Sequence, residues 1–494
     1  MEKTFDKNKL ITIFYFFVPF LLFIFQYLFT INSTNQIRYE ELAESVRNVF
    51  WFKNRLIYDG VSSNVGWYAI LYGVYSFLGF FLFTAKFLRL FLYLLSIISL
   101  SVILKKYLGY KKAFLPLIAI GLSPTLLYLD TLQAQFGIDL QLLPIIILLI
   151  VSINKKHKLK AFLLLFSACI LASLSLMSYP TFIYYLPPLA VFSFVINKKQ
   201  IKNNISLLKN LSLCIFSFLL PLVIIFIYLK NKSLLIFDPV TKGGIFRGSG
   251  KLYFNLDYIY KNLISITADL FNKGESYYFE LTSSEFSGFY PIISVLVVLI
   301  ISFLLLRKRG KRILILSAFF VIILSLVVSS LTFDPSNSPG IRRNTGVIAG
   351  FYLLFCTSWA YVLSNNWKKR FLKYLLIFIF ILIPLHHLII YPTNLNGIAN
   401  KSPYQYSLWF NVAEDPQESL NLFTKKAQQE SLKLSCADAL GKPTYCRYNE
   451  IYSAVSAECY FNHLNCKQIL GYDLKTKEFI PISVKLWREY YWEH

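Results

Sequence analysis

The segment RKRGKRILILSAFFVIILSLVVSSL, residues 307–331, combines the two patterns that decide the fold. Five cations stand between Arg307 and Arg312, and the 19 residues from Ile313 to Leu331 carry no charge. A bilayer core of about 30 Å needs roughly 20 apolar helical residues, because a helix rises about 1.5 Å per residue. The segment therefore predicts a membrane-spanning helix that begins at a basic segment.

The same pattern recurs along the chain of 494 residues, of which 56% are apolar and only 15% charged. An average soluble domain has roughly 25% charged residues, so this composition excludes a disordered chain and disfavours a soluble enzyme. Eleven spans are predicted, and the first is an anchor because it lacks the cleavage site of a signal peptide. The spans are residues 10–31, 87–104, 113–129, 136–153, 160–177, 180–196, 209–229, 288–306, 312–332, 343–364 and 371–391.

The net charge of +24 is a topology signal. Six short segments hold 24 of the cations and, as acids, only Glu2 and Asp6. By the positive-inside rule they all face the cytoplasm, so nucleic-acid binding is not needed to explain the charge. Their cations lie within residues 3–9, 105–112, 155–160, 198–209, 307–312 and 368–373.

Residues 66–84 form a twelfth apolar stretch that is ambiguous. If it crossed, most of the basic segments would fall outside, so it is predicted to be a re-entrant or surface-lying helix on the outer face. Eleven crossings place the N-terminus in the cytoplasm and the C-terminus outside. The predicted protein is thus an all-α multi-pass protein of the cell membrane with outer surface helices and a small extracytoplasmic α+β domain.

Two domains are predicted. Residues 1–391 are the transmembrane domain, with outer loops 32–86 and 230–287, and residues 392–494 are the soluble domain. In the latter, Asp415-Pro416 is typical of a helix start, and residues 468–474 and 478–484 are predicted strands. Its four cysteines suggest two disulfides in an oxidising compartment, and a metal site with His463 is the alternative. These cysteines are Cys436, Cys446, Cys459 and Cys466.

Residues 38–50, RYEELAESVRNVF, have the apolar spacing of an amphipathic surface helix. The motif RY-x-E-L-A-E, the turn Tyr58-Asp59-Gly60, an aromatic helix ending in Leu-Gly and then KFLRL follow the first span in order. Over roughly residues 10–145 this arrangement resembles the GT-C class of membrane glycosyltransferases. The similarity is to the family 39 branch, which includes protein O-mannosyltransferases and lipid A aminoarabinose transferase.

The resemblance implies an acidic pair, acting in catalysis, just ahead of the Arg-Tyr. Asn35 and Gln36 stand there instead. Three alternatives are open: the register of the match is shifted, Glu40 or Glu41 has taken the role, or the protein has lost transferase activity. Arg38, which opens the motif, is a candidate phosphate-binding residue.

Asp130 and Asp139 lie at the predicted outer membrane boundary, where an ionised carboxylate is costly unless it is paired or hydrated. The family has an acid at the head of the fourth span, and Asp139 resembles it. Asp139 is the first candidate for a general base or a metal ligand, with Glu41 second; the alternative for Asp139 is a helix N-cap. The metal, if one is needed, would be Mg²⁺ or Mn²⁺.

Cations in the outer loops are candidates for phosphate binding. Arg247 and Lys251 lie among glycines and serines in KGGIFRGSGK, which suits a phosphate or a flexible turn. Arg342 and Arg343 run against the inside bias, and arginine grips phosphate oxygens bidentately; headgroup anchoring is the alternative.

The predicted function is the transfer of a sugar from a polyprenyl-phosphate donor to an acceptor glycan, lipid or protein on the extracytoplasmic side. The partners would be membrane lipids, this donor and the acceptor, with no nucleic acid. A transporter or flippase for lipid-linked saccharides and a catalytically inactive GT-C-like protein are the alternatives.

Overall fold

The computed structural model describes most of the predicted spans and much of the C-terminal region. The described residues are 7–33, 45–46, 48–53, 64–123, 126–127, 137–153, 158–197, 204–228, 256–257, 259–261, 263–264, 290–331, 344–365, 367, 369–401, 416–434, 448–473 and 478–481.

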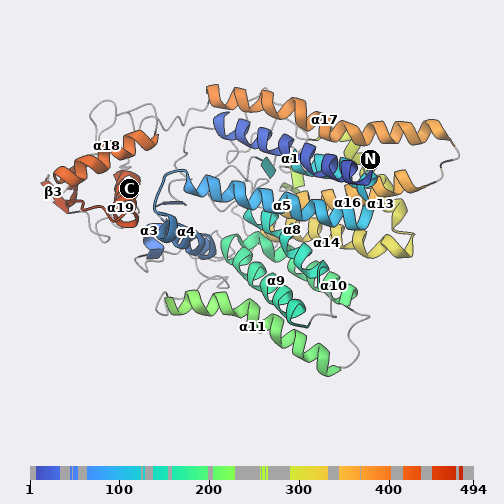
Figure 1. The fold of residues 1–494 in the computed structure, drawn as a ribbon. Coiled ribbons are helices and arrows are strands. Elements are labelled where there is room, and N and C mark those ends of the chain that lie inside the picture. The colour runs from blue at the N-terminus through green and yellow to red at the C-terminus, as the bar shows by residue number, and fades with distance from the viewer. Residues whose placement is uncertain are drawn as a thin grey trace, which may run out of the picture. The chain divides into compact units, whose positions relative to one another are not determined.

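Each of the eleven predicted spans coincides with a helix (Figure 1). The sixth combines a 3₁₀ turn, η3, with α10, and the third, α6, ends earlier than predicted, at Gly121. The helices are α1 Lys7–Ser33, α5 Thr84–Leu108, α6 Tyr110–Gly121, α8 Ile138–Val151, α9 Lys158–Ser178, η3 Pro180–Tyr184, α10 Leu186–Asn197, α11 Asn204–Tyr228, α13 Ile292–Leu305, α14 Arg309–Leu331, α16 Thr345–Ser364 and α17 Arg370–Lys401.

Five segments in the described part of the chain are long and apolar enough to cross a membrane on their own. Shorter apolar helices include Phe14–Leu28, Ile138–Val151, Leu211–Ile225 and Ile292–Leu305. The predicted class, a mostly helical protein with many apolar helices, is confirmed. The long segments are Thr84–Leu108, Leu159–Ser178, Lys311–Ser329, Thr345–Ser364 and Arg370–Ile389.

The closest helix packing that positions the site is between α14 and α16. Gly346 and Gly350, one turn apart, face α14. A Cβ atom on Gly350 would stand 2.8 Å from the backbone oxygen of Ala318, and one on Gly346 would stand 2.7 Å from the Cβ of Ser325. Small residues four apart let two membrane helices approach closely, so this glycine pair fixes α16 on α14.

On α16, residues spaced by seven carry polar groups that hydrogen-bond to other elements. The hydroxyl of Tyr352 donates to the backbone oxygen of Ala119 at 3.3 Å. The indole nitrogen of Trp359 donates to the backbone oxygen of Lys112 at 2.9 Å. Both acceptors lie on α6 and are themselves seven residues apart, so the two helices keep a fixed register.

By compactness the chain divides into two units. The first comprises residues 1–34, 58–66 and 89–402, and the second comprises residues 35–57, 67–88 and 403–494. The second unit thus joins the first outer loop to the C-terminal region. Compactness and membrane placement are different criteria, and the predicted boundary between residues 391 and 392 stays a prediction.

The second unit contains a short sheet and four helices in the described residues. Its strands are ordered β1-β2-β3, with β1 parallel to β2 and β2 antiparallel to β3. The predicted helix after Asp415 and the two predicted strands are present. The elements are α3 Asn48–Lys53, α4 Val65–Leu78 (from Trp67 onward), α18 Pro416–Gln429, β1 Leu432–Leu434, α19 Tyr448–Phe461, β2 Ile469–Asp473 and β3 Glu478–Pro481.

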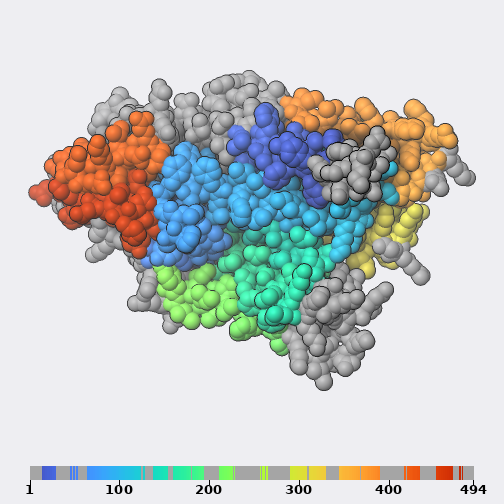
Figure 2. All heavy atoms as spheres, in the orientation of Figure 1, coloured from blue at the N-terminus to red at the C-terminus, as the bar shows by residue number. Residues whose placement is uncertain are grey.

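Aromatic side chains of α4 and α19 pack against each other. In the space-filling view the blue atoms of the α4 region adjoin the red atoms of the C-terminal region (Figure 2). The ring of Phe461 lies 6.0 Å from that of Tyr72 and 5.5 Å from that of Tyr75. The 14 residues of α4 extend about 21 Å, less than a bilayer core. The helices α8 and α13, which coincide with predicted spans, have the same length of 14 residues, so the prediction that residues 66–84 do not cross stays a prediction.

The turn after α4 is held by an amide side chain. Gly79 has φ of 82°, a conformation that glycine adopts without strain. The next residue, Phe80, donates its amide to Oδ1 of Asn462 at 2.7 Å and accepts from Nδ2 of Asn462 at 3.0 Å. This pair of bonds satisfies both backbone groups of Phe80.

Candidate functional site

Of the predicted catalytic and phosphate-binding residues, Asp139 is the one that lies within the described part of the chain. The others lie outside it and stay predictions: Arg38, Glu40, Glu41, Asp130, Arg247, Lys251, Arg342 and Arg343.

Asp139 stands in the first turn of α8 and is fully buried. The N-cap residue of this helix is Gly137, which adopts a left-handed conformation with φ of 76°. The alternative that Asp139 is the N-cap residue is therefore wrong, because the helix begins one residue before it, at Ile138. A carboxylate in the first turn still interacts favourably with the helix dipole, so a purely structural role has to be tested.

Two threonine hydroxyls hold one oxygen of this carboxylate. Thr181 of η3 donates to Oδ2 at 2.7 Å, and Thr345 of α16 donates to the same atom at 2.6 Å. Three elements far apart in the sequence thus converge on a single oxygen. The other oxygen, Oδ1, makes no hydrogen bond within the described residues. The hydrogen bonds to Oδ2 therefore orient the Asp139 carboxylate and leave Oδ1 as the oxygen that could accept a further bond.

Neither threonine was identified from the sequence. A threonine inside or beside an apolar run is common in membrane helices, where its hydroxyl bonds to the preceding turn. The informative signal would have been three polar residues that each begin an apolar helix or turn: Asp139, Thr181 and Thr345.

Two buried cations near the start of α5 were also missed. Arg89 is fully buried and Lys86 nearly so, and both belong to KFLRL. The backbone oxygen of Arg89 accepts a bond of 3.2 Å from Nε2 of Gln141, two residues beyond Asp139. The signal was available, because two cations at the predicted outer end of a span run against the inside bias.

A second set of buried polar side chains surrounds Tyr352, further along α16. The hydroxyl of Tyr290 donates to that of Tyr352 at 3.1 Å and lies 3.3 Å from Oγ of Ser123. His387 packs edge-on against Tyr290, with its Nδ1 3.2 Å from the backbone oxygen of Ala119. The carbonyl of Ala119, near the end of α6, thus has both Tyr352 and His387 within hydrogen-bond distance.

The described residues do not make a complete site for the predicted Mg²⁺ or Mn²⁺. Among them there is no group of three or more His, Cys, Asp or Glu side chains that could hold a metal. Mg²⁺ prefers six oxygen ligands, and Asp139 with two threonine hydroxyls falls short of that set.

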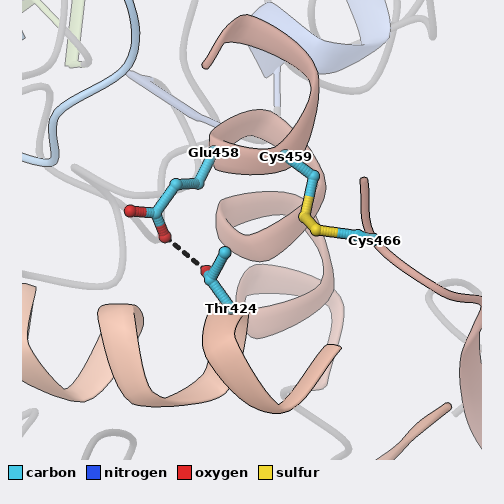
Figure 3. The surroundings of a disulfide bond; sticks show 4 residues. All are labelled: Thr424, Glu458, Cys459 and Cys466. Carbon is cyan, nitrogen blue, oxygen red and sulfur yellow. Dashed lines mark hydrogen bonds between the residues drawn. A yellow bond between two sulfur atoms is a disulfide. The ribbon is translucent and has the colours of Figure 1, made fainter. Parts of the chain in front are cut away.

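The structure describes one pair of the four cysteines for which disulfides are predicted. Cys459 and Cys466 form a disulfide (Figure 3), which removes the metal alternative for these two thiols. Cys436 and Cys446 lie outside the described residues.

Next to the Cys459–Cys466 disulfide, Thr424 of α18 donates a short hydrogen bond to Oε2 of Glu458 on α19. Burial raises the pKa of the Glu458 carboxyl, and the bond from Thr424 opposes that shift.

Comparison with known proteins gives one informative likeness. No protein-family model matches the sequence, and no curated protein matches it. Among solved structures, the chain is similar to ArnT from Cupriavidus metallidurans bound to undecaprenyl phosphate, with a TM-score of 0.50. The similarity covers 91% of this chain and 92% of that one at 11% identity. The chain has a GT-C-like fold.

At this identity the likeness shows the fold alone. The GT-C-like fold and the apolar helices together make the chain a multi-pass membrane protein. Membership of family 39, the side of the membrane on which each terminus lies, the donor and the acceptor are matters for proposal.

Proposed function

We propose that this protein is a membrane glycosyltransferase of the family 39 kind, which moves a sugar from a polyprenyl-phosphate donor to an acceptor on the extracytoplasmic side. The GT-C-like fold supports this proposal, and the ArnT structure of that fold is described as bound to undecaprenyl phosphate. Apolar helices suit the prenyl chain of such a donor, while loops at one face suit its phosphate and the acceptor.

The observation that carries the proposal is the burial and the hydrogen bonding of the Asp139 carboxylate. A fully buried carboxylate costs free energy unless its hydrogen bonds are satisfied, and here only Oδ2 is held. Such an arrangement gives Oδ1 a fixed direction, as a general base requires. In the proposed reaction Oδ1 takes the proton of the acceptor hydroxyl. The acceptor oxygen then bonds to the anomeric carbon, and the bond from that carbon to the phosphate oxygen breaks.

The leaving phosphate takes the electron pair of that bond and needs cations. Arg342 and Arg343 come directly before Asn344 and Thr345 in the sequence, and Thr345 is bonded to Asp139. We assign them to the phosphate, with Arg38, Arg247 and Lys251 as further candidates. Arg89, which is buried near the start of α5, is added as a further candidate.

The rival bases are Glu41, Glu40 and Asp130. The replacement of the family's acidic pair by Asn35 and Gln36 favours a second candidate function, a GT-C-like protein that binds lipid-linked saccharides without transferring the sugar. A flippase for such saccharides has no specific observation in its favour.

A transfer assay decides between these functions. Purified protein in detergent or nanodiscs is incubated with radiolabelled polyprenyl-phosphate sugars and candidate acceptors, and labelled product is measured. We expect transfer with release of polyprenyl phosphate. Saturable donor binding without any transfer, over a broad set of acceptors, would favour the inactive alternative.

A further inference from the structure

A basic cluster lies at the end of α16 that is remote from Asp139. We use this name for Lys112, Lys308 and Lys311 together with the rings of Tyr361 and Trp367. From Thr345 to Tyr361 the helix runs 16 residues, or about 24 Å. The cluster and the candidate catalytic site are therefore at opposite ends of one apolar helix.

Hydrogen bonds fix the first side of this cluster. Nζ of Lys112, at the start of α6, donates to Oγ of Ser364 at 2.6 Å. The backbone oxygen of the same lysine accepts from the indole nitrogen of Trp359 at 2.9 Å. Both partners belong to the last two turns of α16. These two bonds therefore fix the position of Lys112 relative to that helix.

The second side comes from the turn between α13 and α14 and from the first turn of α14. Nζ of Lys308 lies 4.4 Å from the ring centroid of Tyr361, and Nζ of Lys311 lies 5.7 Å from it. The same ring contacts Trp367, with centroids 6.0 Å apart. Lys311 is close enough to both Lys308 and Lys112 for their charges to repel its ammonium.

No acid in the adjoining sequence balances these charges. Residues 105–112, 307–312 and 364–370 together hold twelve Lys and Arg and no Asp or Glu. A tyrosine face attracts an ammonium but does not neutralise it. Bringing like charges from two separate parts of the chain to one place costs free energy, and a bound polyanion would offset that cost.

The surroundings favour a lipid over a soluble anion. The cluster stands where the apolar segments Lys311–Ser329 and Arg370–Ile389 begin. Phe371 is 79% exposed and Tyr374 is 66% exposed on the first turns of α17, so acyl chains would find apolar surface beside the cations. Tyrosine and tryptophan are enriched at headgroup level in membrane proteins, as Tyr361 and Trp367 would be.

We propose that the basic cluster binds the headgroup of an anionic phospholipid that carries two phosphate groups, in the leaflet opposite the catalytic site. Two phosphates match the two sides of the cluster, one at Lys112 and one at Lys308 and Lys311. In the predicted topology this leaflet is the cytoplasmic one, whose surface is anionic.

The test uses the full-length protein and native mass spectrometry. The wild type and the triple variant Lys112→Gln, Lys308→Gln, Lys311→Gln are titrated with cardiolipin, phosphatidylglycerol or phosphatidylcholine. The control variant Lys156→Gln, Lys158→Gln, Lys160→Gln removes the same charge from another basic segment. Thermal unfolding of all three proteins is measured to confirm that they fold.

We expect one tightly bound cardiolipin on the wild type and on the control, and weaker binding by roughly 100-fold on the cluster variant, at about fivefold per lysine. Equal losses in the two variants would overturn the proposal, since general surface charge would then explain binding. Equal affinity for phosphatidylglycerol would contradict the two-phosphate headgroup. Competition by inorganic pyrophosphate as strong as that by cardiolipin would contradict a lipid ligand.

Discussion

The hydroxyl of Thr345 donates to Oδ2 of Asp139 over 2.6 Å, although the two residues are 206 positions apart in the sequence. The bond joins the first turn of α16 to the first turn of α8. A displacement of α16 would therefore also displace Thr345, which is a hydrogen-bond donor to the candidate catalytic carboxylate.

Removing the threonine hydroxyls should disorient the carboxylate. Thr345→Val keeps the shape of the side chain but leaves Oδ2 with one donor, and we expect a loss of about 1–3 kcal/mol in stability and at least tenfold slower transfer. Thr345→Ser, which keeps the hydroxyl, is the control. In the double variant with Thr181→Val the losses should not add, because both donors share one acceptor atom. Thermal unfolding and the transfer rate are measured, and equal behaviour of the Val and Ser variants would contradict the account.

The glycine contact between α14 and α16 should be sensitive to a single methyl group. Gly350→Ala would bring its Cβ to 2.8 Å from the backbone oxygen of Ala318, which has no side-chain freedom to give way. We expect a net destabilisation of about 1–3 kcal/mol and slower transfer, because Thr345 moves with α16. Gly73→Ala in α4 is the matched control, since its Cβ meets nothing within 4 Å. A harmless Gly350→Ala would show that the close contact does not hold α16.

Glu458 should make the C-terminal region more stable at low pH. Burial raises the pKa of this carboxyl in the folded protein, so folding favours the protonated form. Its stabilising effect is complete below the unfolded pKa of about 4.3 and is lost as the pH rises through the higher folded value. Hydrogen exchange of residues 448–461, corrected for intrinsic rates, should show protection falling over this window. Glu458→Gln should abolish the fall, and an unchanged profile in that variant would assign the dependence to another group.

The four cysteines of the C-terminal region should form two disulfides. Cys459–Cys466 is present, and Cys436–Cys446 is the remaining pair by elimination. Intact mass before and after reduction with alkylation counts them. Cys169, Cys214 and Cys356 are free, so two disulfides leave three free thiols on the unreduced protein, and five would contradict the second bond. The Cys459→Ser, Cys466→Ser double variant should lose about 2 kcal/mol, because the bond closes a short loop seven residues in span.

The spans could be predicted from the sequence because hydropathy and charge are local properties. A run such as Ile313–Leu331 behind five cations has few alternatives, and the helix α14 formed there as expected. Strand β1, only three residues long, and helix α19 were not foreseen. The buried face of α19 consists largely of small residues such as Ala454 and Ala457, which give a weak periodic signal.

The site was predicted only in part, for a physical reason. Asp139 stands out because a carboxylate among apolar residues is costly, whereas Thr181 and Thr345 carry no such penalty. Their role depends on contacts across 42 and 206 residues, which no local pattern encodes. The same holds for Asn462 and Phe80, which meet across 382 residues and tie the C-terminal region to the turn after α4.

The most direct test of the central claim is the transfer rate of Asp139→Asn measured beside that of Glu41→Gln. Asparagine keeps the size of Asp139 and can still accept from Thr181 and Thr345, but it cannot take a proton. We predict a folded protein whose transfer rate falls by about 10²–10⁴-fold for Asp139→Asn, with a much smaller effect for Glu41→Gln. A wild-type rate for Asp139→Asn with an inactive Glu41→Gln would move the base to the first outer loop, and wild-type rates for both would contradict this assignment of the chemistry.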